Sequence, residues 1–501
     1  MTPANGPGRT AVGIPGFDEL VHGGLPRGRS TLLAGSTGSG KTVFGLQFLA
    51  AGARMGESGV LVTFAERPDD LIANVESFGW DMSGLVREGR LAVVDATPEE
   101  GTVVTGHFDL GGLSARIAHA LGEVDGKRLF IDPIDALFEE FSSVHEVRRA
   151  FAAMLRELRP LGATTLIAAE RPSESGQVPR YSAEEYVVDN VILLRNVRAD
   201  ERRRRTVEVL KLRGADHHKG EFPFVIDERA GIEIVPFSPI ESGGAGSPER
   251  ISLGNAELDA MCGGGMYRDA LMMVTGATGT GKTLIGLQFM VAGIEAGERV
   301  LYLSFEESPW QLERNAAAWG MDLRTAESAG RLEIVSRYPA RLGLEDLLVD
   351  LKHMVDELKP TRLVLDSITA IEHNSPAKAF REFCVGFSGY LKGRGVATMM
   401  TTTLPTLLGG DHATDLYLST IADSILALRY FEVESQVRRA VLVLKVRGSQ
   451  HASTMYEYEI LETGMSVVGP IEGIRGILTG AAQATTPSGN GRPPAAGGRL
   501  D

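Results

Sequence analysis

Two stretches of the sequence decide the fold: residues 35–42 read GSTGSGKT, and residues 276–283 read GATGTGKT. Both match GxxxxGK[ST], in which glycines let backbone N–H groups point at phosphate oxygens while the following helix presents its positive end. An incidental glycine turn could produce one such match. Two matches, each between an apolar run and a helical pattern, favour two phosphate-binding loops.

The two loops belong to a repeat that spans the chain. Residues 35–52 and 276–293 are identical at 12 of 18 positions, at an offset of 241. RLFIDPIDAL is echoed by RLVLDSITAI, and VEVLKLRGADHH by VLVLKVRGSQHA, each at an offset of 234. Such a period is too long for a solenoid and indicates a duplicated domain.

Each half alternates continuous apolar runs with helical patterns, which indicates an α/β fold with a mostly parallel sheet flanked by helices. We expect domains at residues 1–240 and 250–480, a Gly/Ser/Pro-rich linker at 241–249, and a disordered tail at 481–501. In such sheets ligands bind beyond the carboxyl ends of the strands, and the motifs of this sequence occur at those ends.

Composition excludes several classes of protein. The 501 residues are 43% hydrophobic and 23% charged, as in soluble globular proteins. The sequence has no apolar run long enough to span a membrane and no secretion signal at its start, so we expect no membrane partner. Two cysteines without CxxC spacing, Cys262 and Cys384, fit the cytoplasm and exclude a cysteine-rich zinc site. The net charge of 51 − 65 = −14 weighs against nucleic acid as a partner.

Each half offers side chains for phosphate and metal. Lys41 and Lys282 are expected to reach the β- and γ-phosphates of a nucleotide. Oxygen ligands suit Mg²⁺, and the ligands expected from the two halves are Thr42 with Asp132, and Thr283 with Asp366. The aspartates directly follow apolar runs; an N-cap at the end of a strand is the alternative role for such residues.

An acidic pair follows the next apolar run of each half. The second half has Glu306 and Glu307, whereas the first half has Ala65 and Glu66. A carboxylate in this position can orient or deprotonate an attacking water or hydroxyl. The alternative is an exposed acidic turn.

A Lys-x-Arg pair ends a β-type run near the close of each half. These cations could complete the site in their own half or reach a neighbour's phosphates as an arginine finger; the alternative is a solvated strand end. The pairs are Lys211 with Arg213, and Lys445 with Arg447. We interpret the basic run at residues 202–205 as a solvated or interface turn.

The chain to about residue 480 resembles the KaiC family of circadian clock ATPases and autokinases, within the RecA-like P-loop superfamily. The motifs that carry this resemblance are spread over both halves: LVTFAE, SFGWDM, ERRRRTVEVLKLRG, GEFPFVI, SFEES, AAWGMDL and LSTIADSILALRY. The resemblance implies two tandem RecA-like domains that assemble into a homohexamer of two rings, with ATP and Mg²⁺ at the subunit interfaces. It implies ATP hydrolysis in the N-terminal ring, and autokinase and autophosphatase activity in the C-terminal ring.

Site residues carry over by position. The resemblance makes Ser419 and Thr420 the phosphoacceptors and Glu306 the general base and a metal ligand, with Glu307 beside it and Glu66 as the carboxylate of the first half. The nucleotide contacts that it implies in the first half are Gly38, Ser39, Gly40, Lys41, Thr42, Val43, Ser77, Lys211, Leu212, Arg213 and His217. Those in the second half are Thr278, Gly279, Thr280, Gly281, Lys282, Thr283, Leu284, Trp319, Lys445, Val446, Arg447, Gly448 and Ser449.

The sequence also departs from the family pattern. Ala65 replaces the first glutamate of the N-terminal pair, so Glu66 would serve alone or the first site would be slow. Pro133 follows Asp132 where the family has serine, and Ala422 stands where threonine is usual. The low-complexity tail gives no basis for assuming a KaiA-type activator. A KaiB-like clock protein and a histidine kinase or response regulator are the other partners that the resemblance suggests.

Two other functions stay open on the sequence. Superfamily membership permits a DNA-dependent ATPase, although the acidic charge and the lack of an aromatic-basic stretch oppose it. The other is an ATP-gated scaffold without kinase activity. ATP hydrolysis with and without single-stranded DNA, and phosphoprotein analysis after incubation with ATP, distinguish these functions.

Overall fold

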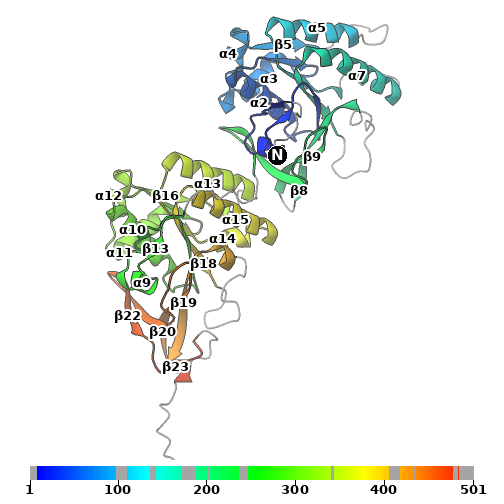
Figure 1. Ribbon diagram of the computed structural model, residues 1–501. Helices are drawn as coiled ribbons and strands as arrows, with labels where there is room; N and C mark the ends of the chain where they lie inside the picture. The colour runs from blue at the N-terminus through cyan, green and yellow to red at the C-terminus, as the bar shows by residue number, and fades with distance from the viewer. Residues whose placement is uncertain are drawn as a thin grey trace, which may run out of the picture. The chain divides into compact units, whose positions relative to one another are not determined.

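A computed structural model describes residues 8–97, 110–135, 143–171, 187–199, 202–235, 246–339, 343–404, 418–433, 435–477 and 483–484. The chain forms two compact units, Met1–Pro236 and Phe237–Asp501 (Figure 1). The predicted linker at 241–249 is described only from residue 246, and the predicted tail only at Gln483–Ala484, which pairs with Ile474–Arg475.

The described part of the first unit is built around a nine-stranded sheet with the order β11-β10-β9-β8-β3-β7-β6-β4-β5. Its strands are β3 (Ser30–Gly35), β4 (Gly59–Thr63), β5 (Leu91–Asp95), β6 (Arg128–Asp132), β7 (Thr164–Glu170), β8 (Asn190–Ala199), β9 (Arg202–Leu212), β10 (Glu221–Asp227) and β11 (Gly231–Ile234). From β8 to β5 neighbouring strands are parallel, and from β8 to β11 they are antiparallel.

Helices cover both faces of this sheet because the apolar runs alternate between two cores. Leu33, Leu61 and Phe130 pack with α2, whereas their neighbours Leu32 and Val60 pack with α5 and α7. The helical segments are α1 (Phe17–Leu20), α2 (Lys41–Arg54), α3 (Pro68–Val75), η1 (Glu76–Phe78), α4 (Met82–Arg87), α5 (Leu110–Glu123), α7 (Val144–Leu158) and η2 (Arg159–Leu161), and a small sheet pairs β1 (Arg9–Thr10) with β2 (Leu25–Pro26). Strands buried on both faces need continuous apolar sequence, as observed.

The second unit repeats this design, with the strand order β16-β15-β17-β18-β14-β19-β20-β21-β22. Its strands are β12 (Arg250–Ile251), β13 (Met266–Tyr267), β14 (Leu271–Gly276), β15 (Val300–Ser304), β16 (Leu332–Ser336), β17 (Arg362–Asp366), β18 (Ala397–Thr403), β19 (Ser424–Val433), β20 (Gln436–Val446), β21 (Tyr456–Leu461), β22 (Gly464–Pro470), β23 (Ile474–Arg475) and β24 (Gln483–Ala484). Its helices are α9 (Ala256–Met261), α10 (Lys282–Glu295), α11 (Pro309–Ala318), α12 (Leu323–Ser328), α13 (Leu344–Leu358), α14 (Thr369–His373), α15 (Ala377–Gly393) and α16 (Leu418–Ile421). The predicted fold, two tandem α/β units with mostly parallel sheets, is confirmed.

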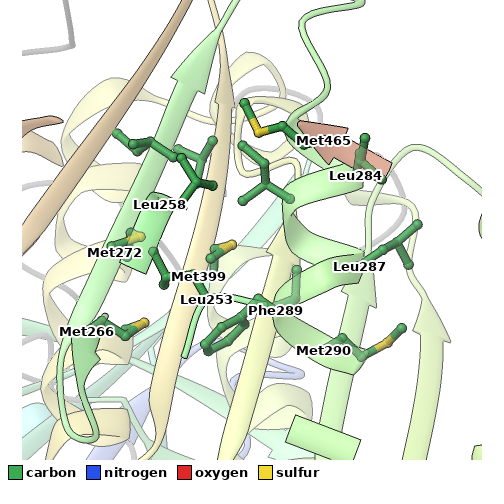
Figure 2. Packing of buried hydrophobic residues seen from close by; sticks show 14 of the residues in the cluster. Leu253, Leu258, Met266, Met272, Leu284, Leu287, Phe289, Met290, Met399 and Met465 are labelled. Atoms are coloured by element: carbon green, nitrogen blue, oxygen red, sulfur yellow. The ribbon is translucent and has the colours of Figure 1, made fainter. Parts of the chain in front are cut away.

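The core of the second unit is rich in methionine. Figure 2 shows side chains of α10 beside methionines from β13, β14, β18 and β22. Methionine has an unbranched, flexible side chain that fills irregular gaps between helix and sheet. This core fixes α10, and therefore the loop that precedes it, against the centre of the sheet.

A buried arginine anchors the first residue of the equivalent strand in each unit. Arg128 donates to the carbonyl of Phe48 at 2.8 Å and to Glu57, and its guanidinium lies 4.6 Å from the Phe48 ring centroid. Arg362 makes the same contacts with Phe289 and Glu298. A Cβ atom added at Gly52 of α2 would lie 2.3 Å from Cδ of Arg128, so glycine makes room for the guanidinium stem.

The prediction of a turn at residues 202–205 is wrong. These arginines begin β9, and the hairpin ladder with β8 extends to the pair Ala199↔Arg202. A run of like charges does not prevent a strand, because the backbone hydrogen bonds of the ladder are satisfied whatever the side chains are and long arginine side chains can keep their charge in water.

Candidate functional site

In each unit the phosphate loop leaves the central strand at its carboxyl end and enters a long helix. Gly40 caps α2 with φ 99°, and Gly281 caps α10 with φ 92°. This left-handed backbone suits glycine and directs the N-terminus of each helix, with its unsatisfied N–H groups, toward the loop. Both loops therefore have the geometry of an anion site.

In the first unit the loop borders a pocket of about 420 Å³. Its lining includes Lys41, Thr42, Glu66, Asp132 and Glu170. The pocket lies at the carboxyl ends of β3, β4, β6 and β7, where a doubly wound sheet places its ligands. The first predicted site is thus brought together by four strands.

Lys41, the basic group of this pocket, is bound by the backbone of its own loop. Lys41 Nζ donates to the carbonyls of Gly35 at 2.8 Å and Ser36 at 3.0 Å. Burial lowers the pKa of Lys41, while the charges of Glu170, Asp132 and Asp135 raise it, in that order. A nucleotide phosphate would take the place of the two carbonyls as the partner of this ammonium group.

Thr42 and Asp132 fit a Mg²⁺ ion. Thr42 Oγ1 donates to Asp132 Oδ2 at 2.7 Å, so two hard oxygen donors converge on one point, and burial raises the pKa of Asp132. Among the described residues no group of three or more His, Cys, Asp or Glu could hold a metal without help. Mg²⁺ at this point would therefore depend on phosphate and water for its remaining ligands.

The second unit holds the equivalent aspartate differently. Asp366 accepts hydrogen bonds from the hydroxyl of Tyr302, at 2.8 Å, and from that of Thr401. Tyr302 and Thr401 are both fully buried. Burial, and then the charge of Asp366, hold the pKa of Tyr302 well above its usual value, so the tyrosine keeps its proton and donates it. Lys282, on the loop, donates to the carbonyl of Ala277 at 3.0 Å.

The two acids after β15 point in different directions. Glu306 Oε1 accepts from Ser367 Oγ at 2.7 Å, which places its carboxylate beside the residue that follows Asp366. Glu307 Oε2 instead accepts from Asn315 Nδ2 of α11 at 3.1 Å. Burial, followed by the charge of Asp366, raises the pKa of Glu307. Of the predicted pair, Glu306 is the one whose carboxylate is bound next to Asp366.

The strand registers of the two sheets allow the two sites to be compared residue by residue. Thr63 pairs with Asp132 as Ser304 pairs with Asp366, and Leu33 pairs with Ala168 as Val274 pairs with Thr401. On this alignment Glu306 and the three residues that bind Asp366 or Glu306 in the second site have apolar counterparts in the first. The four pairs of corresponding residues, with that of the second unit given first, are Tyr302 and Leu61, Glu306 and Ala65, Ser367 and Pro133, and Thr401 and Ala168.

The first site has acids where the second has threonines. Asp135 and Glu170 occupy the positions of Thr369 and Thr403. The sequence motifs do not single out these two acids, nor Tyr302, Ser367 and Thr401. A residue-by-residue alignment of the two halves beyond the motifs would reveal them, because each is a polar-for-apolar or acid-for-hydroxyl exchange on a strand or within three residues of its end.

The phosphate loops follow the carboxyl ends of the parallel strands, whereas the Lys-x-Arg pairs lie toward the amino ends of those strands. Lys445 pairs with Ile425, which pairs with Met273, three residues before Gly276. At 3.3 Å per residue, this backbone position is about 10 Å from the end of β14 that carries the loop. Lys211 has the same register in the first unit, level with Leu32. These cations are therefore directed away from the loop of their own unit.

The predicted phosphoacceptors lie beside these cations. Lys445 Nζ donates to the carbonyls of Ser419 at 2.8 Å and Ala422 at 2.7 Å, and Arg447 Nη2 donates to that of Thr420 at 2.6 Å. Lys211 makes the equivalent bond to the carbonyl of Val188 at 2.7 Å. The structure thus brings Lys445, Arg447 and the acceptor pair together, at the edge opposite Glu306.

The other predicted contacts follow their motifs. The loop residues Gly38, Ser39, Thr278, Gly279 and Thr280 precede the helices, and Val43, Thr283 and Leu284 lie in their first turns. Ser77 lies in η1, and Trp319 caps α11 and packs against the core. Near the Lys-x-Arg pairs lie Leu212, Arg213 and His217 in the first unit, and Val446, Gly448 and Ser449 in the second.

None of the helices in the described ranges combines the length and apolar character needed to cross a membrane.

The family model described as "ATPase: KaiC" matches the chain twice, at residues 10–238 and 251–472. The chain is 47% identical over 479 residues to the circadian clock protein KaiC3 of Synechocystis sp., covering 95% of each chain. It is 42% identical to the circadian clock oscillator protein KaiC of Synechococcus elongatus, over 94% of this chain and 91% of that one. It is also 42% identical to KaiC of Thermostichus vulcanus, over 93% and 90% of the two chains.

Proposed function

The chain belongs to the KaiC family of ATPases, and on this basis we propose that it is an ATPase and a Ser/Thr autokinase and autophosphatase that acts as a homohexamer of two rings. In this proposal the first unit hydrolyses ATP. The second unit transfers the γ-phosphoryl group to Ser419 or Thr420 of a neighbouring subunit. ATP and Mg²⁺ occupy both sites.

One observation supports transfer between subunits above all others. The acceptor pair and the cations that hold it lie at one edge of the second sheet, whereas the phosphate loop and Glu306 lie at the other. A phosphoryl group bound at Lys282 cannot reach Ser419 or Thr420 of the same chain without a large rearrangement. The acceptor of another copy, arranged head to tail, removes this difficulty, and head-to-tail contacts form a ring where the rotation between copies closes.

The residues of the second site then take separate roles. Lys282 neutralises charge on the transferring phosphoryl group, and Glu306 accepts the proton of the attacking hydroxyl. Ser367 fixes the Glu306 carboxylate for this purpose at 2.7 Å. Mg²⁺, held by Thr283 and Asp366, would supply further charge neutralisation. Lys445 and Arg447 of the neighbouring subunit would complete the set of positive charges.

The clock context of this activity comes from the relatives. All three relatives are circadian clock proteins by name. We propose the same context here, with a KaiB-like protein and a histidine kinase or response regulator as partners and the cytoplasm as the location. Phosphorylation would add about −1.5 to −2 charge beside Lys445 and Arg447, and so would give a partner a surface to distinguish.

Peptide mass spectrometry after incubation with Mg-ATP tests the kinase. Phosphate is expected on Ser419, Thr420 or both, and the double variant Ser419→Ala/Thr420→Ala should lose it. The matched control removes another Ser-Thr pair, Ser453 and Thr454, which is exposed after β20; this control should label normally. Unchanged labelling in the first double variant would overturn the assignment of Ser419 and Thr420 as acceptors, and wild-type chains that take up no phosphate would replace the kinase with an ATP-gated scaffold.

A mixing experiment tests transfer between subunits. Lys282→Ala chains, which keep their acceptors, are assembled with Ser419→Ala/Thr420→Ala chains, which keep their kinase site. Phosphate should appear on the Lys282→Ala chains, identified by mass, although neither variant labels itself alone. Phosphate absent from the mixture, with labelling of wild-type chains intact, would contradict the proposed geometry.

A further inference from the structure

The first site lacks the carboxylate that the second site places beside its metal-binding aspartate. Ala65 stands at the position of Glu306. Glu66 stands at the position of Glu307, whose carboxylate is bound by Asn315 of α11 rather than by Ser367. Hydrolysis needs a group that orients water at the γ-phosphate. Ala65 supplies no such group, and Glu66, which lines the pocket, stands at the position of Glu307 rather than at that of Glu306.

Another carboxylate enters the same pocket from a different strand. Glu170 is the last residue of β7, and β7 lies between β3 and β6 in the sheet. Its carboxyl end therefore emerges between the phosphate loop and Asp132. Glu170 pairs with Gly35 in the sheet register and lines the pocket with Lys41 and Thr42.

Contacts on both sides hold Glu170 in this position. Its Oε1 accepts a hydrogen bond from the hydroxyl of Thr37, which is part of the phosphate loop. Its backbone N–H donates to Asp135 Oδ2 at 2.5 Å. Among the carboxylates that raise the pKa of Lys41 against the effect of burial, Glu170 acts most strongly. In the second unit the equivalent residue is Thr403, which has no carboxylate to offer.

We propose that Glu170 is the carboxylate that orients and deprotonates the attacking water in the first unit; this inference rests on the proposed ATPase function of that unit. The water oxygen forms a bond to the γ-phosphorus, and the bond from that phosphorus to the β,γ-bridging oxygen breaks. The electron pair of that bond stays on ADP. The proton of the water passes to Glu170 and then to solvent.

In each unit the strand that ends in the metal-binding aspartate has one neighbouring strand on either side, and the two units take their catalytic carboxylate from different sides. In the first unit the acid comes from β7, and in the second unit it comes from the end of β15. The difference fits the acceptors: a water molecule can enter beside the loop at Thr37, whereas the second unit must leave its site open for a hydroxyl of another chain. The substitution at Ala65 is therefore compensated in the fold.

The test measures phosphate release in chains that carry Lys282→Ala, so that only the first site turns over. Glu170→Gln should lower kcat roughly 10²–10⁴-fold. The KM for ATP and the affinity for a fluorescent ATP analogue should stay within a few-fold, because the amide preserves the shape of the side chain. Glu228→Gln, on the exposed turn before β11, is the control and should leave kcat unchanged. Adding Ala65→Glu to Glu170→Gln should restore part of the lost rate.

Two further variants separate the possible failures. If Lys41→Ala in the same background does not reduce phosphate release, the first unit is not the ATPase and the proposed function fails. If Lys41→Ala abolishes release while Glu170→Gln turns over normally, the ATPase stands and the assignment of Glu170 is overturned. A large loss in Glu66→Gln with none in Glu170→Gln would likewise overturn it, in favour of Glu66.

Discussion

Replacing Tyr302 with phenylalanine removes one oxygen atom from the second site and leaves the ring in place. The Tyr302 hydroxyl donates to Asp366 at 2.8 Å, and the side chains are 0% and 7% exposed. Water cannot replace the lost donor readily at such a buried position. A hydrogen bond to a charged group contributes about 1.5–3 kcal/mol, so we expect Tyr302→Phe to destabilise the second unit by about 2 kcal/mol.

Urea unfolding followed by tryptophan fluorescence measures this loss. The chain has three tryptophans, and in a Trp80→Phe background the remaining two, Trp310 and Trp319, both report on the second unit. With a slope of about 2 kcal/mol per molar urea, the midpoint should fall by about 1 M without a change in slope. Nucleotide and Mg²⁺ are left out, because a bound ligand would add its own stabilisation.

Tyr390→Phe is the matched control in the same unit. Tyr390 is 3% exposed, and its hydroxyl donates at 3.0 Å to a neutral acceptor, the carbonyl of Lys352. Loss of a neutral hydrogen bond should cost about 1 kcal/mol, half the expected effect at Tyr302. A midpoint in Tyr302→Phe that equals wild type, or a loss smaller than that of Tyr390→Phe, would refute the argument that Tyr302 supports a charged Asp366.

Three other perturbations follow from the structure. Lys41→Ala should damage ring assembly and most steady-state hydrolysis, whereas Lys282→Ala should abolish autophosphorylation and spare the first site; phosphate release and labelling, each reduced roughly 10²-fold or more in the affected unit, check this. Burial raises the pKa of Asp135 to about 6 from 3.8, so the folded state binds this proton more tightly than the unfolded state and stability is lost as pH rises from about 4 to about 6. Asp135→Asn should therefore stabilise the first unit at pH 7.5 by up to about 3 kcal/mol and much less at pH 4; equal shifts in melting temperature at both pH values would contradict this. Gly52→Ala should destabilise the first unit by about 1–3 kcal/mol, because the new Cβ would lie 2.3 Å from the buried arginine of β6. Gly122→Ala in α5, where a Cβ meets no atom within 4 Å, should stabilise by about 0.5–1 kcal/mol, and calorimetry compares the two.

The sequence was sufficient to predict the parts of each site that are local in the chain. A phosphate loop such as residues 35–42 carries its turn and the start of its helix in one segment, and the duplication supplied a second phosphate loop, a second aspartate after a strand and a second Lys-x-Arg pair. The hydrogen bonds of Asp366 could not be predicted in this way. They join residues of three strands, and Tyr302 reaches Asp366 only because β15 and β17 pair in one particular register.

Charge patterns were the least informative part of the sequence. The arginines at 202–205 suggested a turn because like charges usually lie in solvated segments, but hairpin length depends on the pairing of β9 with β8. The position of Lys445 could not be predicted either. The sequence indicates that Lys445 is near the end of a strand, but not whether that end lies beside the amino ends or the carboxyl ends of the parallel strands. Register and strand order, which are properties of the folded chain, decide both questions.

The exchange of four polar residues for Leu61, Ala65, Pro133 and Ala168 also bears on how the two units diverged after duplication. All four positions lie on a strand or within two residues of its end, so the two sites differ by point substitutions within one topology. Each unit could then accumulate changes in its chemistry while the other preserved nucleotide binding. A substitution at one of these positions can therefore alter one site while both folds and the other site are kept.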